Sequence, residues 1–310
     1  MKILVTGKNG QVGHELSRSL QRFGEVIALD RSQMNLSDPS QIRDVIRDIR
    51  PDLIVNPAAY TAVDLAETEM ALAMQVNGDA PAVIAQEARK CGAAMIHYST
   101  DYVFDGAKSG PYVEADPGCP ISQYGRSKLA GEEAIIASGV PHLILRTSWV
   151  YGLHGKNFLK TIQRLAAERD VLRIVSDQYG APTWALTIAE GTAMAIDKLC
   201  GKDDAEGGTG SISPDAWSEH GGIVHLTAQG TTSWHGFAAE IVARGPRASQ
   251  VEVTPIPTSA YPTPARRPQN SVLSSTVFQK RFGPLPDWKS ALIACLSEQE
   301  QLQSMSRCAD

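Results

Sequence analysis

A tyrosine and a lysine four residues apart form the pair with the clearest chemistry in this chain. Tyr124 and Lys128 open a stretch with a helical pattern. Residues four apart share one face of a helix, so the phenol and the ammonium can converge on one ligand. A nearby cation stabilises a phenolate, and we expect it to lower the tyrosine pKa from its usual value of about 10. The pair predicts a proton donor to a carbonyl that becomes an alcohol.

A hydroxyl group is the expected partner of this pair. Ser99, Thr100 and Asp101 directly follow the apolar run at residues 94–98, which reads as a buried strand. Hydroxyls at the end of such a strand can hydrogen-bond the carbonyl oxygen that is being reduced. We assign this role to Thr100, so the predicted catalytic residues are Thr100, Tyr124 and Lys128.

A glycine-rich turn near the N-terminus predicts a dinucleotide site. Gly7, Gly10 and Gly13 follow the apolar run at residues 3–5 and precede an amphipathic stretch at residues 11–22. Such a strand-to-helix turn lets the backbone approach a pyrophosphate, with the helix N-terminus facing its charge. The position of the glycines, after the first strand and before the first helix, supports this interpretation.

Two adjacent residues give opposite indications about the nicotinamide cofactor. Asp30 ends the second predicted strand, where an acid can accept hydrogen bonds from the adenosine ribose of NAD. Arg31 follows it and can pair with the 2′-phosphate of NADP. The sequence therefore allows either cofactor. At the end of the third predicted strand, the small residues Ala58 and Ala59 leave room for a cofactor close to the backbone.

The elements that position these residues alternate between strands and helices, which implies a parallel sheet with helices on both faces. The fold class expected is α/β: a Rossmann-type doubly wound parallel sheet with a smaller, mixed α/β C-terminal substrate domain. The first, NAD(P)-binding domain takes residues 1–150 and 184–228, and the discontinuous substrate domain takes 151–183 and 229–310. The predicted strands are 3–5, 26–29, 53–55, 94–98, 142–145, 172–175 and 223–226, and the predicted helices are 11–22, one from residue 39, 80–90, one from residue 124, 187–199 and 288–305.

Two later segments lack a regular pattern. Residues 202–222 are rich in Gly, Ser and Asp, which predicts a mobile surface loop. Residues 255–268 carry five prolines, which exclude a regular helix and favour an ordered extended loop.

Composition excludes several classes of protein. The 310 residues are 43% hydrophobic and 20% charged with a net charge of -5, which argues against disorder and against a nucleic-acid-binding surface. No apolar run is long enough for a membrane helix or a signal peptide. The five cysteines are widely spaced and form no CxxC pair, so neither disulfides nor a zinc site are expected, and a cytoplasmic location fits.

Together these motifs resemble the extended short-chain dehydrogenase/reductase family, and the resemblance covers nearly the whole chain. The matching blocks lie at residues 7–13, 55–64, 97–104, 124–128, 146–151, 177–183 and 257–265. The last two blocks are more specific than the generic motifs of the family. They imply reduction of the C4 ketone of dTDP-4-dehydro-β-L-rhamnose to dTDP-β-L-rhamnose by NADPH or NADH, with Tyr124 as the proton donor.

The resemblance also implies roles for individual residues. The residues implied to hold the cofactor, together with those named above, are Gly7, Gly10, Gln11, Val12, Gly13, Asp30, Arg31, Ala59, Tyr60, Thr61, Tyr98, Tyr124 and Lys128. Those implied to bind the dTDP-sugar are Val63, Thr100, Asp101, Tyr102, Trp149, Asn157, Arg267 and Asn270. Arginine suits a diphosphate because its planar fork donates two parallel hydrogen bonds.

Some implications stay open. Certain members of the family carry Mg²⁺ at a dimer contact, but Trp184 and Ala185 stand where an acid would follow the 177–183 block, so the sequence does not support the metal. The chain is expected to act as a monomer or a homodimer. The alternatives in function are another nucleotide-sugar reductase or epimerase of the same family, or a non-catalytic NADP-binding regulatory subunit resembling the methionine adenosyltransferase beta subunit. A dehydratase is disfavoured because Tyr102, not glutamate, follows Asp101.

Overall fold

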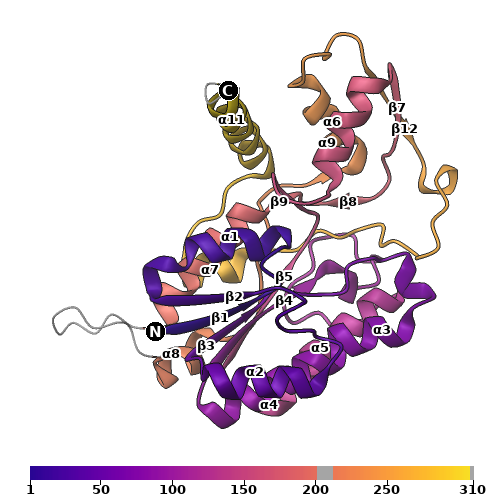
Figure 1. Cartoon of the computed structure of the whole chain (residues 1–310). Helices are drawn as coiled ribbons and strands as arrows, with labels where there is room; N and C mark the ends of the chain where they lie inside the picture. Colours follow the sequence, from indigo (N-terminus) through magenta and orange to yellow (C-terminus); the bar gives the residue numbers. More distant parts are fainter. Residues whose placement is uncertain (201–211, 308–310) are drawn as a thin grey trace.

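The computed structural model describes residues 1–200 and 212–307, which form two lobes (Figure 1). The larger lobe contains a six-stranded, fully parallel sheet in the order β10-β5-β4-β3-β1-β2. Its strands are β1 (Lys2–Thr6), β2 (Glu25–Leu29), β3 (Leu53–Asn56), β4 (Ala94–Thr100), β5 (His142–Thr147) and β10 (Gly222–His225). The predicted doubly wound α/β fold is confirmed.

Alternation along the strands divides the core of this lobe into two layers. Ile3 and Val5 point to one face of the sheet, whereas Leu4 between them points to the other. Strands β3, β4 and β5 repeat the pattern, so both faces of the sheet are apolar and both must be covered.

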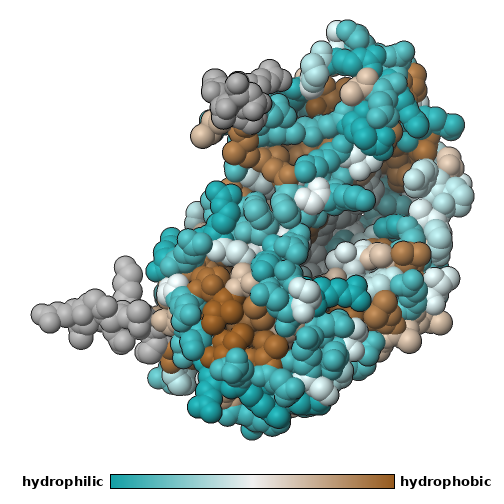
Figure 2. Space-filling view, in the orientation of Figure 1, coloured by the Kyte–Doolittle hydropathy of each residue, from teal (hydrophilic) through white to brown (hydrophobic). Residues whose placement is uncertain are grey.

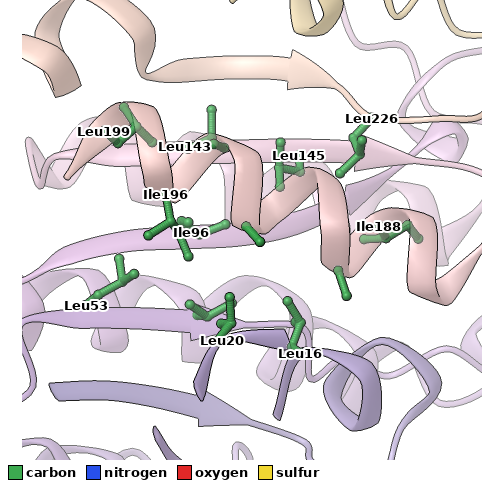
Figure 3. Close-up of a cluster of buried hydrophobic side chains, with 14 of the residues drawn as sticks. Leu16, Leu20, Leu53, Ile96, Leu143, Leu145, Ile188, Ile196, Leu199 and Leu226 are labelled. Atoms are coloured by element: carbon green, nitrogen blue, oxygen red, sulfur yellow. The ribbon is translucent and has the colours of Figure 1, made fainter. Parts of the chain in front are cut away.

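Helices cover both faces. One face is covered by α1 (Gln11–Ser19), α7 (Ala185–Leu199), α8 (Pro214–His220) and α10 (Thr276–Phe282), and the other by α2 (Pro39–Ile49), α4 (Ala80–Cys91) and α5 (Gln123–Ser138). Figure 3 shows Leu16 and Leu20 of α1 facing Ile188 and Ile196 of α7, with the strand residue Ile96 beside them. These contacts hold the glycine turn that precedes α1 rigidly at the end of β1.

Local signals explain where two of these helices begin. The carboxylate of Asp38 accepts hydrogen bonds from the backbone N–H groups of Ser40 and Gln41 and so caps α2, the helix predicted from residue 39. The hydroxyl of Ser122 accepts a hydrogen bond from the N–H of Gly125 and caps α5. The cap fixes the first turn of α5, where Tyr124 lies.

The smaller lobe has its own hydrophobic core. It is built from α6 (Phe158–Glu168), α9 (Trp234–Ala243), α11 (Trp288–Arg307) and the parallel pair β7 (Val171–Val175) and β12 (Glu252–Ile256). Short strands join the two lobes: β6 (Val150–Tyr151) with β9 (Thr183–Trp184), and β8 (Tyr179–Gly180) with β11 (Thr232–Ser233). Tyr151 and Phe237 are fully buried at its centre.

Several expectations need correction. Part of the predicted loop 202–222 is the helix α8, capped by the Ser213 hydroxyl and anchored by the buried Trp217; residues 202–211 lie outside the described part of the chain. The helices α6, α9 and α10 were not predicted. Phe278 of α10 belongs to the core of the sheet, although the predicted boundary assigned residues 229–310 to the other domain.

The topology marks one edge of the sheet for a ligand. After β1 the chain forms β2 on one side of it, and then crosses over to form β3 on the other. Ligands of open α/β sheets bind outside the carboxyl ends of the strands at such a switch point. Gly7 follows β1 and Pro57 follows β3 there. Among the described residues, no helix is long and apolar enough to span a membrane.

Candidate active site

A cleft of about 760 Å³ lies at the switch point, and the space-filling view in Figure 2 shows the molecule hollowed between its two lobes. The size falls within the usual range of ligand sites. Every residue predicted to hold the cofactor lines this cleft: Gly7, Gly10, Gln11, Val12, Gly13, Asp30, Arg31, Ala59, Tyr60, Thr61, Tyr98, Tyr124 and Lys128. The structure therefore brings together residues that are up to 121 positions apart in the chain (128 minus 7).

The glycine turn has the close contacts that only glycine permits. Gly7 has φ +63°, and a Cβ placed on it would lie 2.9 Å from the Cβ of Ala58. A Cβ on Gly13 would lie 2.1 Å from the backbone oxygen of Gly7. These contacts pack α1 against the turn, so that the backbone N–H groups at the start of the helix face the cleft and suit a pyrophosphate.

We expect Gly13→Ala to weaken NADPH binding at least about tenfold, since the added methyl group must push the first turn of α1 away from the Gly7 carbonyl. Isothermal titration calorimetry measures the affinity. Gly110→Ala is the matched control, because a Cβ there meets no atom within 4 Å. Unchanged affinity in Gly13→Ala would contradict the role assigned to this turn.

The two residues that gave opposite indications about the cofactor differ in how they are engaged. The Asp30 carboxylate accepts hydrogen bonds from the backbone and hydroxyl of Ser32 and lies 3.4 Å from Lys8 Nζ. These hydrogen bonds, chiefly from the Ser32 side chain, lower the pKa of Asp30. Arg31 is exposed at the rim of the cleft and has no ion pair among the described residues. The Asp30 carboxylate can therefore still accept hydrogen bonds from a ribose, and the Arg31 guanidinium remains available to a phosphate.

Tyr124 and Lys128 lie in the first turns of α5, where Lys128 is buried and Tyr124 is half-buried. Burial raises the pKa of Tyr124, and a hydrogen bond with Thr100 acts in the opposite direction. The expected lowering by Lys128 was wrong for this structure. Lys128 Nζ instead donates to the Tyr98 carbonyl at 2.6 Å and lies 3.1 Å from His97 Nε2. Tyr124 is therefore held in its protonated form, the form that a proton donor needs.

Thr100 and Asp101 complete this group. Thr100 Oγ1 donates to Asp101 Oδ1 at 2.9 Å, and both side chains are buried. Burial raises the pKa of Asp101 to about 6, against the opposing hydrogen bonds of Ser271 and Thr100. Its second oxygen, Oδ2, has no hydrogen-bond partner within the described residues. A buried acceptor without a partner suits the hydroxyl of a sugar.

We expect Asp101→Asn to stabilise the fold at pH 8 by about 1–3 kcal/mol, which is the free energy of the pKa shift from 3.8 to about 6. The folded chain binds this proton more tightly than the unfolded chain, so the stability of the wild type falls as the pH rises through this interval. The advantage of the variant should shrink by about 1 kcal/mol between pH 8 and pH 5. Urea unfolding at both pH values measures it. A variant less stable than the wild type at pH 8 would contradict this.

The residues predicted to bind the sugar nucleotide do not line this cleft, but Tyr102 and Arg267 lie next to the catalytic group. Arg267 donates to the Tyr102 hydroxyl at 2.8 Å and to Asp64 Oδ2 at 2.7 Å. The Tyr102 ring meets the Tyr124 ring edge-on, with centroids 5.5 Å apart. Arg267 thus links the proline-rich segment 255–268 to Tyr102, and through the Tyr102 ring to Tyr124.

The other predicted substrate residues are engaged in local structure. Asn157 caps α6 and donates to Gln11 Oε1 at 2.9 Å, and Asn270 donates to the carbonyls of Lys108 and Gly110. Val63 follows the third strand beside Asp64 and is half-buried. Trp149 has φ +49°, a strained conformation for a bulky residue, and stacks on Trp234 at 3.6 Å. Strain of this kind is frequent at ligand sites.

Several residues at the cleft were not predicted. Ser99 Oγ and Thr147 Oγ1 line it, are buried, and find no hydrogen-bond partner in the part of the chain that the structure describes. Lys156 lines it from the loop before α6. His97 lies behind Lys128, and a histidine inside an apolar strand was the overlooked signal that could have identified it. The unpartnered hydroxyls of Ser99 and Thr147 and the positive charge of Lys156 suit a polar, anionic cofactor.

The sequence does not support a metal site, because no acidic residue follows the block at residues 177–183. Within residues 1–200 and 212–307, no three His, Cys, Asp or Glu side chains form a group that could hold a metal ion. Glu15 of α1 and Glu190 of α7 do approach Glu298 of α11, and burial raises the pKa of both Glu15 and Glu190.

Comparison with known proteins agrees with this geometry. The family model described as the RmlD substrate binding domain matches residues 1–301. The dTDP-4-dehydrorhamnose reductase of Burkholderia thailandensis is 50% identical over 305 residues, covering 96% of this chain and 99% of that protein. The crystal structure of a dTDP-4-dehydrorhamnose reductase from Clostridium acetobutylicum superposes with a TM-score of 0.86 at 34% identity, covering 97% of this chain and 100% of that chain.

A further solved structure is a dTDP-4-dehydrorhamnose reductase from Bacillus anthracis in complex with NADP. It has a TM-score of 0.83 at 32% identity and covers 96% of this chain and 99% of that chain. The chain belongs to the dTDP-4-dehydrorhamnose reductase (RmlD) family.

Proposed function

We propose that this chain reduces the C4 ketone of dTDP-4-dehydro-β-L-rhamnose to give dTDP-β-L-rhamnose, with NADPH or NADH as reductant. The observation that carries the proposal is the junction of the dinucleotide cleft with the group of Thr100, Tyr124 and Lys128. The relatives described above are named for this activity, and the match covers nearly the whole length of each of them. The NADP complex of a relative supports the choice of cofactor.

The cofactor fits the residues that line the cleft. The backbone at Gly7, Gly10 and Gly13 would hold its pyrophosphate, and Lys128 its nicotinamide ribose. Arg31 suits the 2′-phosphate of NADP, whereas Asp30 suits the ribose of NAD, so we propose that both are accepted. When bound, the reduced nicotinamide supplies a hydride for the sugar carbon.

The protein's own groups handle the proton. Tyr124 O–H donates its proton to the sugar O4 as the carbonyl becomes an alkoxide, and burial keeps that proton on the phenol until then. The Thr100 hydroxyl donates to Asp101 in the ligand-free structure, and we propose that it turns from Asp101 to donate to the carbonyl oxygen and orient it. Asp101 holds a sugar hydroxyl. In the ligand-free structure Lys128 points to Tyr98 and His97, and we propose that its charged form turns to the Tyr124 phenolate once the cofactor is bound.

The smaller lobe would complete the substrate site. We propose the division at 1–150 with 184–228 and at 151–183 with 229–310, except that α10 packs with the first domain. Trp149 and the Arg267 segment then bring the sugar nucleotide to Tyr124. We further propose a monomer or homodimer acting in the cytoplasm, where Cys91, Cys119, Cys200 and Cys295, all free, would stay reduced.

Addition of dTDP-4-dehydrorhamnose to the purified chain with NADPH or NADH tests this function. We expect oxidation of the cofactor in proportion to the ketosugar added, followed by its absorbance. An epimerase would change the sugar without net oxidation of the cofactor. A regulatory subunit would bind NADP(H) and oxidise none on addition of substrate, and either result would contradict the proposal.

A further inference from the structure

Three buried polar side chains cross the sheet in a row directly behind Lys128. Thr6, Asn56 and His97 each come two residues after Leu4, Ile54 and Met95, whose side chains pack on the face covered by α5. 

Strand alternation therefore aims Thr6, Asn56 and His97 at that same face. The residues are only 0–1% exposed, and Asn56 and His97 are register partners in the pair β3–β4.

Hydrogen-bond distances fix the direction of the first link. The backbone N–H of Ala58 donates to Thr6 Oγ1 at 3.3 Å, so this hydroxyl already accepts one bond. Thr6 Oγ1 lies 2.6 Å from Asn56 Oδ1, a separation usual for O–H···O and short for N–H···O. The hydroxyl therefore donates to the amide oxygen, and the amide nitrogen of Asn56 must face the other way.

The second link fixes the proton on the histidine. Asn56 Nδ2 lies 3.1 Å from His97 Nδ1 and can only donate, so Nδ1 must be the accepting nitrogen of a neutral ring. The ring proton then lies on Nε2, which is 3.1 Å from Lys128 Nζ. Two N–H donors cannot bond to each other, so the lysine must accept there with the lone pair of a neutral amine.

We propose that Thr6, Asn56 and His97 form a positioning chain that favours the neutral amine of Lys128 in the ligand-free protein and couples the protonation of Lys128 to a turn of the Asn56 amide. In the alternative arrangement, the amide oxygen accepts from His97 Nδ1, and His97 Nε2 accepts from the Lys128 ammonium. That arrangement leaves the Thr6 proton without its acceptor. The inference rests on the proposed function only in its claim that the charged lysine serves Tyr124.

Among the titratable groups next to Thr6, Asn56 and His97, Lys128 is the one whose pKa lies near neutral pH. Burial lowers its pKa to about 8, opposed by Glu132 one turn further along α5, whose carboxylate is paired with Arg146 of β5. Burial and the Lys128 charge lower the pKa of His97 well below 6.5, so the ring is neutral. From β4, Tyr98 offers Lys128 its backbone carbonyl, and burial raises the pKa of the Tyr98 phenol.

The position of the ring proton can be read without substrate by nitrogen NMR of histidine-labelled protein. The chain has seven histidines, and His97→Gln assigns the signal. In the ligand-free wild type at about pH 9, above the Lys128 pKa, we expect the proton on Nε2. Thr6→Val removes the hydroxyl that orients the amide and should move proton population to Nδ1, whereas Thr6→Ser keeps the hydroxyl and should restore the wild-type pattern.

A pH profile supplies the second readout. If the charged lysine is needed, kcat/KM falls at high pH near the Lys128 pKa, and Thr6→Val should move that limb upward by about 0.5–1 unit. Thr6→Ser should leave it in place, whereas a merely structural defect would lower activity at every pH without moving the limb. 

Wild-type protein that keeps the proton on Nδ1 at about pH 9 would overturn the inference, even if Thr6→Val failed to fold. A changed tautomer with an unmoved limb would overturn the coupling. Absence of any NADPH oxidation by the wild type would instead refute the proposed function and leave the tautomer result standing.

Discussion

Tyr124→Phe is expected to lower the turnover number about 10²–10⁴-fold, the usual contribution of a general acid. The variant loses only the phenolic O–H, whose proton the ketone oxygen needs, and keeps the ring that packs edge-on against Tyr102. Lys128 keeps its hydrogen bond to the Tyr98 carbonyl, so the affinity for NADPH should stay nearly unchanged. Steady-state kinetics and calorimetry measure the two effects separately.

The matched control is Tyr112→Phe. Tyr112 is buried, and its variant loses the hydrogen bonds that the phenol donates to Asp105 and accepts from the Lys108 N–H, but it packs in a separate cluster with Phe104 and Leu273. Its turnover should remain close to that of the wild type. Near-normal turnover in Tyr124→Phe would remove this residue from the chemistry, whereas an equal loss in both variants would show a general structural effect.

Glu132→Ala is expected to cost about 3–5 kcal/mol of stability, because it leaves a buried guanidinium without its partner. Glu132 and Arg146 form two parallel hydrogen bonds, of 2.9 and 2.6 Å, with side chains only 1% and 4% exposed. The pair ties α5, which carries Tyr124 and Lys128, to the strand β5. Urea unfolding measures the loss.

Two comparisons isolate the buried charge as the cause. Glu168→Ala breaks the exposed pair with Arg164 within α6 and should change the stability by less than about 0.5 kcal/mol. The double change Glu132→Met with Arg146→Leu removes both charges and should recover much of the loss. A single Glu132→Ala variant that loses less than about 1 kcal/mol would contradict the importance of the pair.

Signals between residues close in the sequence predicted much of the fold. Gly7, Gly10 and Gly13 follow one another within a single turn, and Asp38 caps the helix that it precedes. Alternation of apolar strands and helices was enough to predict the doubly wound sheet, because each strand must be buried on both faces. The Tyr124–Lys128 spacing needed only one helix to bring both residues to the cleft.

Features that depend on pairing between distant segments were missed. The His97–Asn56 contact follows from the register of β3 and β4, which the sequence of either strand alone does not reveal. The raised pKa of Tyr124 depends on burial and on the direction in which Lys128 points. The helix α8 was hidden in a segment rich in Gly and Ser, where burial of Trp217 against the sheet outweighs weak local propensity.

The central claim is that the sugar ketone lies against the nicotinamide beside Tyr124. Its most direct test is reduction of dTDP-4-dehydrorhamnose by the purified chain with NADPH that carries deuterium at the transferred position, followed by NMR and mass spectrometry of the sugar. The account predicts a single deuterium at C4 of the product. A product without deuterium, or with deuterium at another carbon, would contradict it.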